Sequence, residues 1–288
     1  MMEMLSCVSV PAEDGGLDVY CTTQWPQVVQ EAIALILNIP ENSINMKLRR
    51  LGGSFGGKIS RGNLIGGACS LAAYLLQRPV RMVVKLETMM EAIGKRPPSY
   101  FTYEAGVNIE GEIQYLNTNV YEDTGSAFND PVTLPFLFPS FTSVYDSKYW
   151  GTQMFDVKTD KPCNVWTRSP GTLEGITLPE QIMEHIAHEI GKDPLSVRMQ
   201  NFDKAYPTET LIKLVKEKSD YETRKTAVEE FNKGNVWKKR GISLVPMGFP
   251  IDTLGNFYAL VSIYRNDGTV AITHGGVEMG QGINTKAA

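Results

Sequence analysis

A glycine cluster early in the chain restricts the possible folds of this sequence more than any other feature. It reads GGSFGGK from Gly52 to Lys58 and follows an alternating apolar stretch that predicts a strand over residues 44–51. Glycine tolerates positive φ angles and lets backbone N–H groups approach a ligand closely, so such a loop can hold an anion. The loop therefore predicts a site for a phosphate-bearing cofactor. The plain alternative is a glycine-rich turn that binds nothing.

The same residues satisfy the GxxxxGK spacing of a nucleotide-binding P-loop. In that motif the residue after the lysine is Ser or Thr, whose hydroxyl holds magnesium. Here that residue is Ile59. A P-loop-like nucleotide-binding protein therefore stays as the less favoured alternative.

A second glycine loop lies near the end of the sequence. His274 to Gly282 reads HGGVEMGQG and follows a predicted hairpin whose turn is Arg265 to Gly268. Gly280-Gln281-Gly282 lacks the third glycine that a dinucleotide fingerprint requires. Because both glycine loops leave a strand, together they fit one large anionic ligand, and His274 adjoins that site.

The remaining periodicity predicts an alternation of strands and helices. We expect strands over 17–22 and 78–85, strands within 104–118 joined by a turn at 109–112, an ordered loop over 130–141, and helices over 28–36, 64–76, 180–189, 194–200 and within 209–231. This order indicates an α/β (α+β) fold with mixed sheets and packed helices. A Gly-, Asn- and Lys-rich stretch at 234–239 reads as a linker, which divides the chain into a first domain, 1–233, and the start of a second, 234–288, incomplete at the C-terminus.

Composition excludes several classes of protein. The net charge of −4, from 28 basic and 32 acidic residues, argues against a nucleic-acid partner. The longest apolar run, 64–76, is shorter than the roughly 20 residues that span a membrane, and no signal peptide is apparent. The four cysteines form no CxxC motif, so neither an iron–sulfur cluster nor a zinc knuckle is expected. We expect a cytoplasmic protein with no membrane partner.

Two histidines imitate a metal site. His185 and His188 lie at helical spacing beside Glu184 and Glu189. Their order matches neither HExxH nor HxxEH, so we interpret them as exposed helix residues.

Taken together, the two loops resemble the molybdenum-cofactor portion of the aldehyde oxidase and xanthine dehydrogenase family. The first loop resembles that family's GGGFGGK, with Ser54 in place of one glycine, and the second resembles HGGTEMGQG. Residues 22–24 resemble an STQ segment, and 231–241 resemble an FNK…WKKRG stretch. The resemblance implies the molybdopterin-binding fold of molybdenum hydroxylases.

The resemblance also implies roles for particular residues. Thr167 to Gly171 resembles the family's FRGFG element, in which Arg168 keeps the arginine. Gln24, Phe55 and Arg168 would surround the molybdenum and orient it through hydrogen bonds, without ligating it. The cofactor-binding residues that the resemblance implies are Gln24, Gly53, Phe55, Gly56, Arg168, Gly280 and Gln281.

Two positions bear on the substrate. Xanthine dehydrogenases carry a glutamate where this chain has Ile59, and Pro170 replaces a phenylalanine that stacks on substrate. No arginine lies within 130–141, where those enzymes clamp the purine. A pocket without these charged groups cannot offset the desolvation of a purine and suits aldehydes instead. The resemblance therefore implies an aldehyde oxidase, such as the insect type, with Ile59 and Pro170 in its substrate pocket.

The implied reaction is the oxidation of aldehydes to carboxylic acids with water as the oxygen source. The full-length parent would also carry FAD and [2Fe-2S] clusters and would form a homodimer. Its catalytic base is expected beyond residue 288, so we assign no catalytic residue here. Glu278 lies within the second glycine loop, and the resemblance makes it part of the wall that binds the cofactor and not the base. We expect this chain to be inactive alone. The alternative is a catalytically inactive molybdopterin-fold fragment or scaffold.

Overall fold

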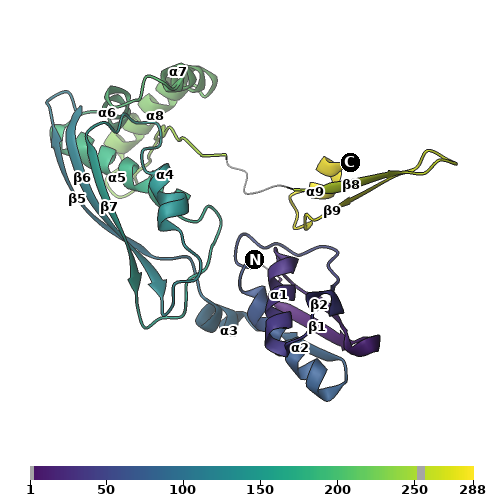
Figure 1. Ribbon diagram of the computed structural model, residues 1–288. Helices are drawn as coiled ribbons and strands as arrows, with labels where there is room; N and C mark the ends of the chain where they lie inside the picture. Colours follow the sequence, from purple (N-terminus) through teal and green to yellow (C-terminus); the bar gives the residue numbers. More distant parts are fainter. Residues whose placement is uncertain (1–2, 252–256) are drawn as a thin grey trace.

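The computed structural model of the protein describes residues 3–251 and 257–288, which form two lobes and a separate β-hairpin (Figure 1). The strands are β1 (Ser6–Pro11), β2 (Leu17–Cys21), β3 (Ile44–Met46), β4 (Val80–Val83), β5 (Ser99–Val107), β6 (Ile113–Gly125), β7 (Trp150–Lys158), β8 (Ala259–Ile263) and β9 (Val270–His274). The helices are α1 (Pro26–Leu37), α2 (Gly62–Leu76), α3 (Leu86–Thr88), α4 (Phe138–Ser140), α5 (Thr172–Ile190), α6 (Pro194–Gln200), α7 (Thr208–Lys218), α8 (Tyr221–Gly234) and α9 (Ile283–Ala287).

The first lobe is a four-stranded mixed sheet in the order β3-β2-β1-β4, with α1 and α2 on one face. Strand β2 pairs antiparallel with β1 and parallel with β3. Leu17, Val19 and Cys21 alternate with more exposed residues along β2, and all three are buried in the core that includes α1 and α2. Period-two burial of this kind is what a sheet covered on one face requires.

The second lobe is a three-stranded sheet, β5-β6-β7, covered by α5. Leu116 and Val120 of β6 are fully buried in one cluster with Ile182 and Met183 of α5. Gly191 ends α5 in the left-handed conformation, and the Asp193 side chain then caps α6 by accepting hydrogen bonds from two backbone amides. These caps fix the direction of α6 relative to α5.

The mixed-sheet α/β (α+β) class is confirmed, and so are most of the expected elements. The strand expected over 44–51 is wrong beyond Met46. After Lys47, whose N–H still bonds to Val19 O at 2.8 Å, the chain leaves the sheet and enters the glycine loop.

Three further expectations differ from the structure. The loop expected over 130–141 contains helical turns at Thr133–Leu137 and Phe138–Ser140, which bury Leu137 against α5. The helix expected over 180–189 already begins at Thr172, and it continues through Pro179, which lies inside it. Strands β1 and β7 were not expected at all. β7 pairs parallel with β6, and such long-range pairing leaves little local signal.

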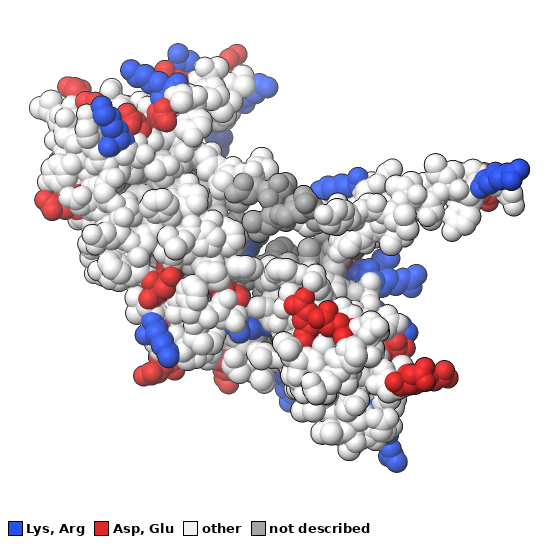
Figure 2. Space-filling model, in the orientation of Figure 1, with Lys and Arg blue, Asp and Glu red and all other residues white. Residues whose placement is uncertain are grey.

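The C-terminal hairpin β8–β9 confirms the expected turn at Arg265 to Gly268. Most of its apolar side chains are exposed, including Leu260 and Ile263. The hairpin ends at His274, from which the second glycine loop leads into α9. Acidic and basic side chains are interspersed over the lobe that holds β5–β7 (Figure 2). Among the described residues, no helix combines the length and apolarity needed to cross a bilayer.

A buried ion cluster joins α5 to α6. The Arg198 guanidinium, 1% exposed, donates to Glu180 and Glu184 at 2.6 Å each, and the Tyr145 hydroxyl also donates to Glu180. Buried charges of this kind are stable only when every partner is present.

We therefore predict that Arg198→Met destabilises the protein, because it leaves the Glu180 carboxylate buried without its cation. The expected loss is about 3–5 kcal/mol of unfolding free energy, measured by urea denaturation. The matched control is Lys216→Met, which breaks the exposed Lys216–Glu222 pair and costs about 1 kcal/mol or less. Equal losses in the two variants would contradict this account.

A buried carboxylate sits on β6. The Glu122 side chain is fully buried, accepts a hydrogen bond from the Ser99 hydroxyl, and has one oxygen with no partner among the described residues. The pKa of Glu122 is raised to about 7, mainly by burial and to a lesser extent by the nearby Glu174 and Asp156 carboxylates, against the opposing effects of Ser99 and Arg96. The folded state therefore holds this proton more tightly than the unfolded chain does.

Because its folded pKa lies above the unfolded value, Glu122 makes the protein less stable as pH rises from 5 to 8. We predict that Glu122→Gln removes this contribution, about 2 kcal/mol across that range. The measurement is the unfolding free energy of wild type and variant at both pH values. Glu229→Gln, an exposed change on α8, should retain the wild-type pH dependence. An unchanged dependence in Glu122→Gln would refute the assignment.

Candidate functional site

The first glycine loop has an unusual backbone. Gly53, Phe55 and Gly56 have φ angles of +89°, +52° and +91°. A Cβ atom at Gly56 would lie 2.7 Å from the carbonyl oxygen of Trp166, so only glycine fits there. The Phe55 side chain is 56% exposed. The loop therefore presents an aromatic ring and a tightly curved backbone.

Gln24 holds this loop in place. Its Oε1 accepts hydrogen bonds from Gly56 N at 2.9 Å and from Lys58 N at 3.3 Å, and its own N–H donates to Lys58 O at 2.9 Å. The Gly56 amide is thus engaged within the protein. Among the described residues, the N–H groups of Gly53, Ser54 and Phe55 have no hydrogen-bond acceptor, so they remain available donors of the loop.

Lys58 is an internal support of the loop. Its side chain is fully buried and its Nζ lies 2.7 Å from the Glu3 carboxylate, which also accepts from Gly52 N at 2.9 Å. Partial burial acts to raise the pKa of Glu3, but the hydrogen bonds from Lys58 and Gly52 outweigh it and hold the pKa below its usual value. The P-loop alternative needs this lysine on a phosphate, and here it faces the protein interior.

The segment that contains Arg168 packs directly on the first loop. Arg168 N donates to Phe55 O at 2.8 Å. Arg168, Ser169 and Gly171 all have positive φ angles, of +25°, +55° and +67°. Two of these are non-glycine residues, so the conformation is strained and needs external support.

Arg96 provides that support. Its guanidinium donates to the carbonyl oxygens of Arg168 and Ser169 and forms an ion pair with Glu174 at 2.8 Å. One side chain thus ties the strained segment to the first turn of α5. No sequence pattern points to Arg96, because its partners are backbone carbonyls more than seventy positions away.

The second glycine loop meets the first through the backbone. Leu51 N donates to Glu278 O at 2.8 Å, which places the two loops together as expected from the sequence. The Glu278 carboxylate accepts from the amides of Gly280 at 2.9 Å and Gly282 at 3.1 Å, and these bonds lower its pKa. The Gln281 side chain bonds to Met279 N and Val277 O of its own loop. Gly280 and Gln281 therefore make their hydrogen bonds inside the loop.

Two clefts border this meeting point. One, of about 380 Å³, lies between the segment after β3 and the second loop, and its wall includes Arg49, His274 and Gly275. His274 Nδ1 accepts from Gly276 N at 3.1 Å, so the histidine shapes the start of that loop.

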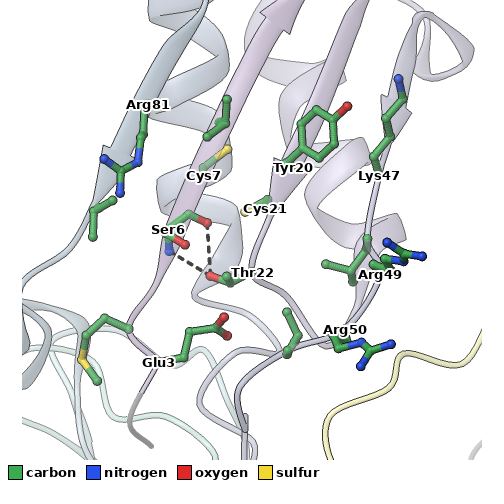
Figure 3. A pocket seen from close by; sticks show the side chains of 15 residues that line it. Glu3, Ser6, Cys7, Tyr20, Cys21, Thr22, Lys47, Arg49, Arg50 and Arg81 are labelled. Atoms are coloured by element: carbon green, nitrogen blue, oxygen red, sulfur yellow. Dashed lines mark hydrogen bonds between the residues drawn. The ribbon is translucent and has the colours of Figure 1, made fainter.

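The other cleft, of about 410 Å³, is lined by side chains of Lys47, Arg49, Arg50 and Arg81 (Figure 3). Lys47 is paired with Asp18 at 2.6 Å, whereas the three arginines form no ion pair among the described residues. These cations border the approach to the first glycine loop.

Of the two expected substrate-pocket residues, one directly follows the first glycine loop and the other lies in the Arg168 segment that packs on that loop. Ile59 follows Lys58 and is half-buried, with its N–H donating to Gly56 O at 3.1 Å. Pro170, also half-buried, accepts from Thr172 N at 2.7 Å. The histidines of α5 lie elsewhere: His185 contacts the Tyr103 hydroxyl, and no group of metal-binding side chains occurs among the described residues.

Comparison with known proteins identifies the family of this chain. Two family models described as "Molybdopterin cofactor-binding domain" match residues 1–202 and 214–288. Aldehyde oxidase 4 of Arabidopsis thaliana is 36% identical over 99% of this chain, and the xanthine dehydrogenase of Dictyostelium discoideum is 36% identical over 96%. The chain spans 22% of the length of each of these two relatives.

Solved structures share the fold. The CO dehydrogenase of Oligotropha carboxidovorans matches 81% of this chain with a TM-score of 0.70 at 20% identity, over 32% of its own length. The aldehyde oxidoreductase of Desulfovibrio gigas matches 82% with a TM-score of 0.68 at 19% identity, over 27% of its length. With the family models and the curated relatives, the conclusion is that this chain belongs to the molybdopterin cofactor-binding domains of the aldehyde oxidase and xanthine dehydrogenase family.

Proposed function

We propose that this chain forms part of the molybdopterin site of an enzyme that oxidises aldehydes to carboxylic acids, with oxygen supplied by water. One observation carries the proposal. Hydrogen bonds join Gln24 to the first glycine loop, Phe55 of that loop to Arg168, and Leu51, which directly precedes the loop, to Glu278. Residues far apart in the sequence thus form one wall. We assign 1–233 to a first molybdopterin-binding domain and 234–288 to the start of a second.

The available groups fit an anionic cofactor. The N–H groups of Gly53 and Phe55 lack acceptors among the described residues, and Arg49 lines the adjacent cleft. Backbone N–H donors of this kind, together with a cation a few residues earlier in the chain, are the groups that a phosphate needs. When bound, the molybdenum of this cofactor supplies the two-electron oxidation.

The roles of the individual residues follow from their hydrogen bonds. Because Oε1 of Gln24 is already shared by two amides, its Nε2 is the donor left for the molybdenum side of the cofactor. Phe55 and Arg168 are joined by the hydrogen bond from Arg168 N to Phe55 O, so we place both at the same side of the cofactor. Gly56, Gly280 and Gln281 act mainly by shaping their loops.

Apolar residues at the substrate side favour an aldehyde. Ile59 and Pro170 offer no charge with which to hold a purine, and several relatives are named aldehyde oxidases. We place FAD and [2Fe-2S] clusters in the longer protein and expect it to be a cytoplasmic homodimer without nucleic-acid or membrane partners. An inactive scaffold remains the competing function and would retain the cofactor without supporting turnover.

Cofactor retention tests the role of Gln24. The wild-type chain, purified from a host that makes the cofactor, should retain molybdenum and the fluorescence of oxidised pterin. Gln24→Leu should lower both about fivefold, because it removes the acceptor that holds two loop amides, worth roughly 1 kcal/mol. Gln27→Leu, on the exposed surface of α1, should match wild type. Binding of magnesium-ATP in place of pterin would instead support the P-loop alternative.

Turnover by the longer enzyme tests the role of Ile59. Ile59→Glu should lower kcat/KM for benzaldehyde by about one to two decades, because a carboxylate without a partner, worth roughly 1.5–3 kcal/mol, is desolvated in the pocket. It should not create xanthine oxidation, since the arginine partner is also absent. A wild-type enzyme that already prefers xanthine would show that Ile59 lies outside the substrate pocket.

A further inference from the structure

A small apolar cavity lies beside the first glycine loop, apart from the two clefts already described. Its volume is about 210 Å³. Apolar side chains make up most of its wall: Met4, Phe55, Leu86, Met89, Ile93 and Val165. Ile59 and Pro170 are not part of this wall.

One polar side chain in the wall, that of Ser54, makes no hydrogen bond to the described residues. Ser54, which lines the cavity, is 3% exposed, and its Oγ is buried without a hydrogen-bond partner among the described residues. A buried hydroxyl normally has a partner, and leaving it without one is unfavourable. An oxygen atom of a ligand in the cavity would provide that partner.

The size of the cavity restricts its occupant. A protein cavity of about 150 Å³ holds a benzene molecule, so this one has room for a single ring with a short substituent. The charge of the wall restricts it further. Arg96 is already committed to Glu174 and two carbonyls, and Lys95 is exposed at the rim, so the buried part offers no cation to a carboxylate.

We propose that this cavity binds a single-ring aromatic molecule carrying one uncharged oxygen, such as an aromatic aldehyde, with that oxygen hydrogen-bonded to Ser54 Oγ. The choice of an aldehyde rests on the proposed function, whereas binding itself requires no cofactor. Phe55 and Thr167, which adjoin Ser54 and Arg168 in sequence, also line the cavity. The ligand therefore lies against the first glycine loop and the Arg168 segment. The cavity would hold an aldehyde next to the reaction site before it reacts.

Methionine methyl groups report on this cavity directly. Met4, Met89 and Met90 line it, so a chain labelled with 13C at the methionine methyls shows occupancy by chemical shift. We would titrate it with toluene, with benzyl alcohol as an unreactive oxygen-bearing probe, and with benzaldehyde. All three should shift the signals of these three methionines and leave those of Met154 and Met199 unchanged.

The contribution of Ser54 is measured as a ratio, the Kd for toluene divided by the Kd for benzyl alcohol. Ser54→Ala should lower this ratio about fivefold, the effect of one hydrogen bond. Ser70→Ala is the matched control, because Ser70 Oγ is also buried with no partner in the part of the chain that the structure describes, but lies in α2, outside this cavity. Its ratio should equal that of wild type.

Absence of methyl shifts with every probe would overturn the proposal, and so would an unchanged ratio in Ser54→Ala. If the wild-type chain retains molybdenum but binds no probe, this proposal fails and the proposed function stands. If it binds the probes but retains no molybdenum or pterin, the cavity is real and the cofactor assignment fails.

Discussion

The carboxamide of Gln24 is the contact on which the site depends. By accepting from Gly56 N and Lys58 N, it closes the first glycine loop against the start of α1. In the closed loop, the Phe55 carbonyl accepts a hydrogen bond from Arg168 N. Leu51, which directly precedes the loop, donates its N–H to the Glu278 carbonyl. Without that closure, neither the Arg168 segment nor the second glycine loop has a fixed surface on which to pack.

The two lobes also meet through polar contacts close to this loop. Arg61, at the start of α2, donates to the carbonyls of Cys163 and Asn164 in the second lobe, and Ser60 donates to Asp130 at 3.0 Å. Asp130 accepts from Trp166 N as well, two residues before Arg168. Each lobe keeps its own apolar core, so the contacts between them can be specific and polar. The site therefore lies where polar contacts fix the position of one independently packed lobe relative to the other.

Local features could be predicted from the sequence, and long-range partners could not. The glycine loops and the turn before β9 each depend on residue types within a few positions of one another. Strand β7 depends on pairing with β6 across an intervening helix and loop, and Arg96 depends on carbonyls of the Arg168 segment. The family resemblance supplied Gln24 and Arg168 as site residues, but not the hydrogen bonds that hold them.

The second glycine loop has an anion of its own. Glu278 is tethered only a few bonds from the amides of Gly280 and Gly282, so its effective concentration at those donors is very high. A free phosphate in solution competes poorly with such an internal ligand. The loop is thereby protected from stray anions. Only a ligand that gains energy from several walls at once can exchange with the carboxylate, and this makes selectivity a property of the whole site rather than of one loop.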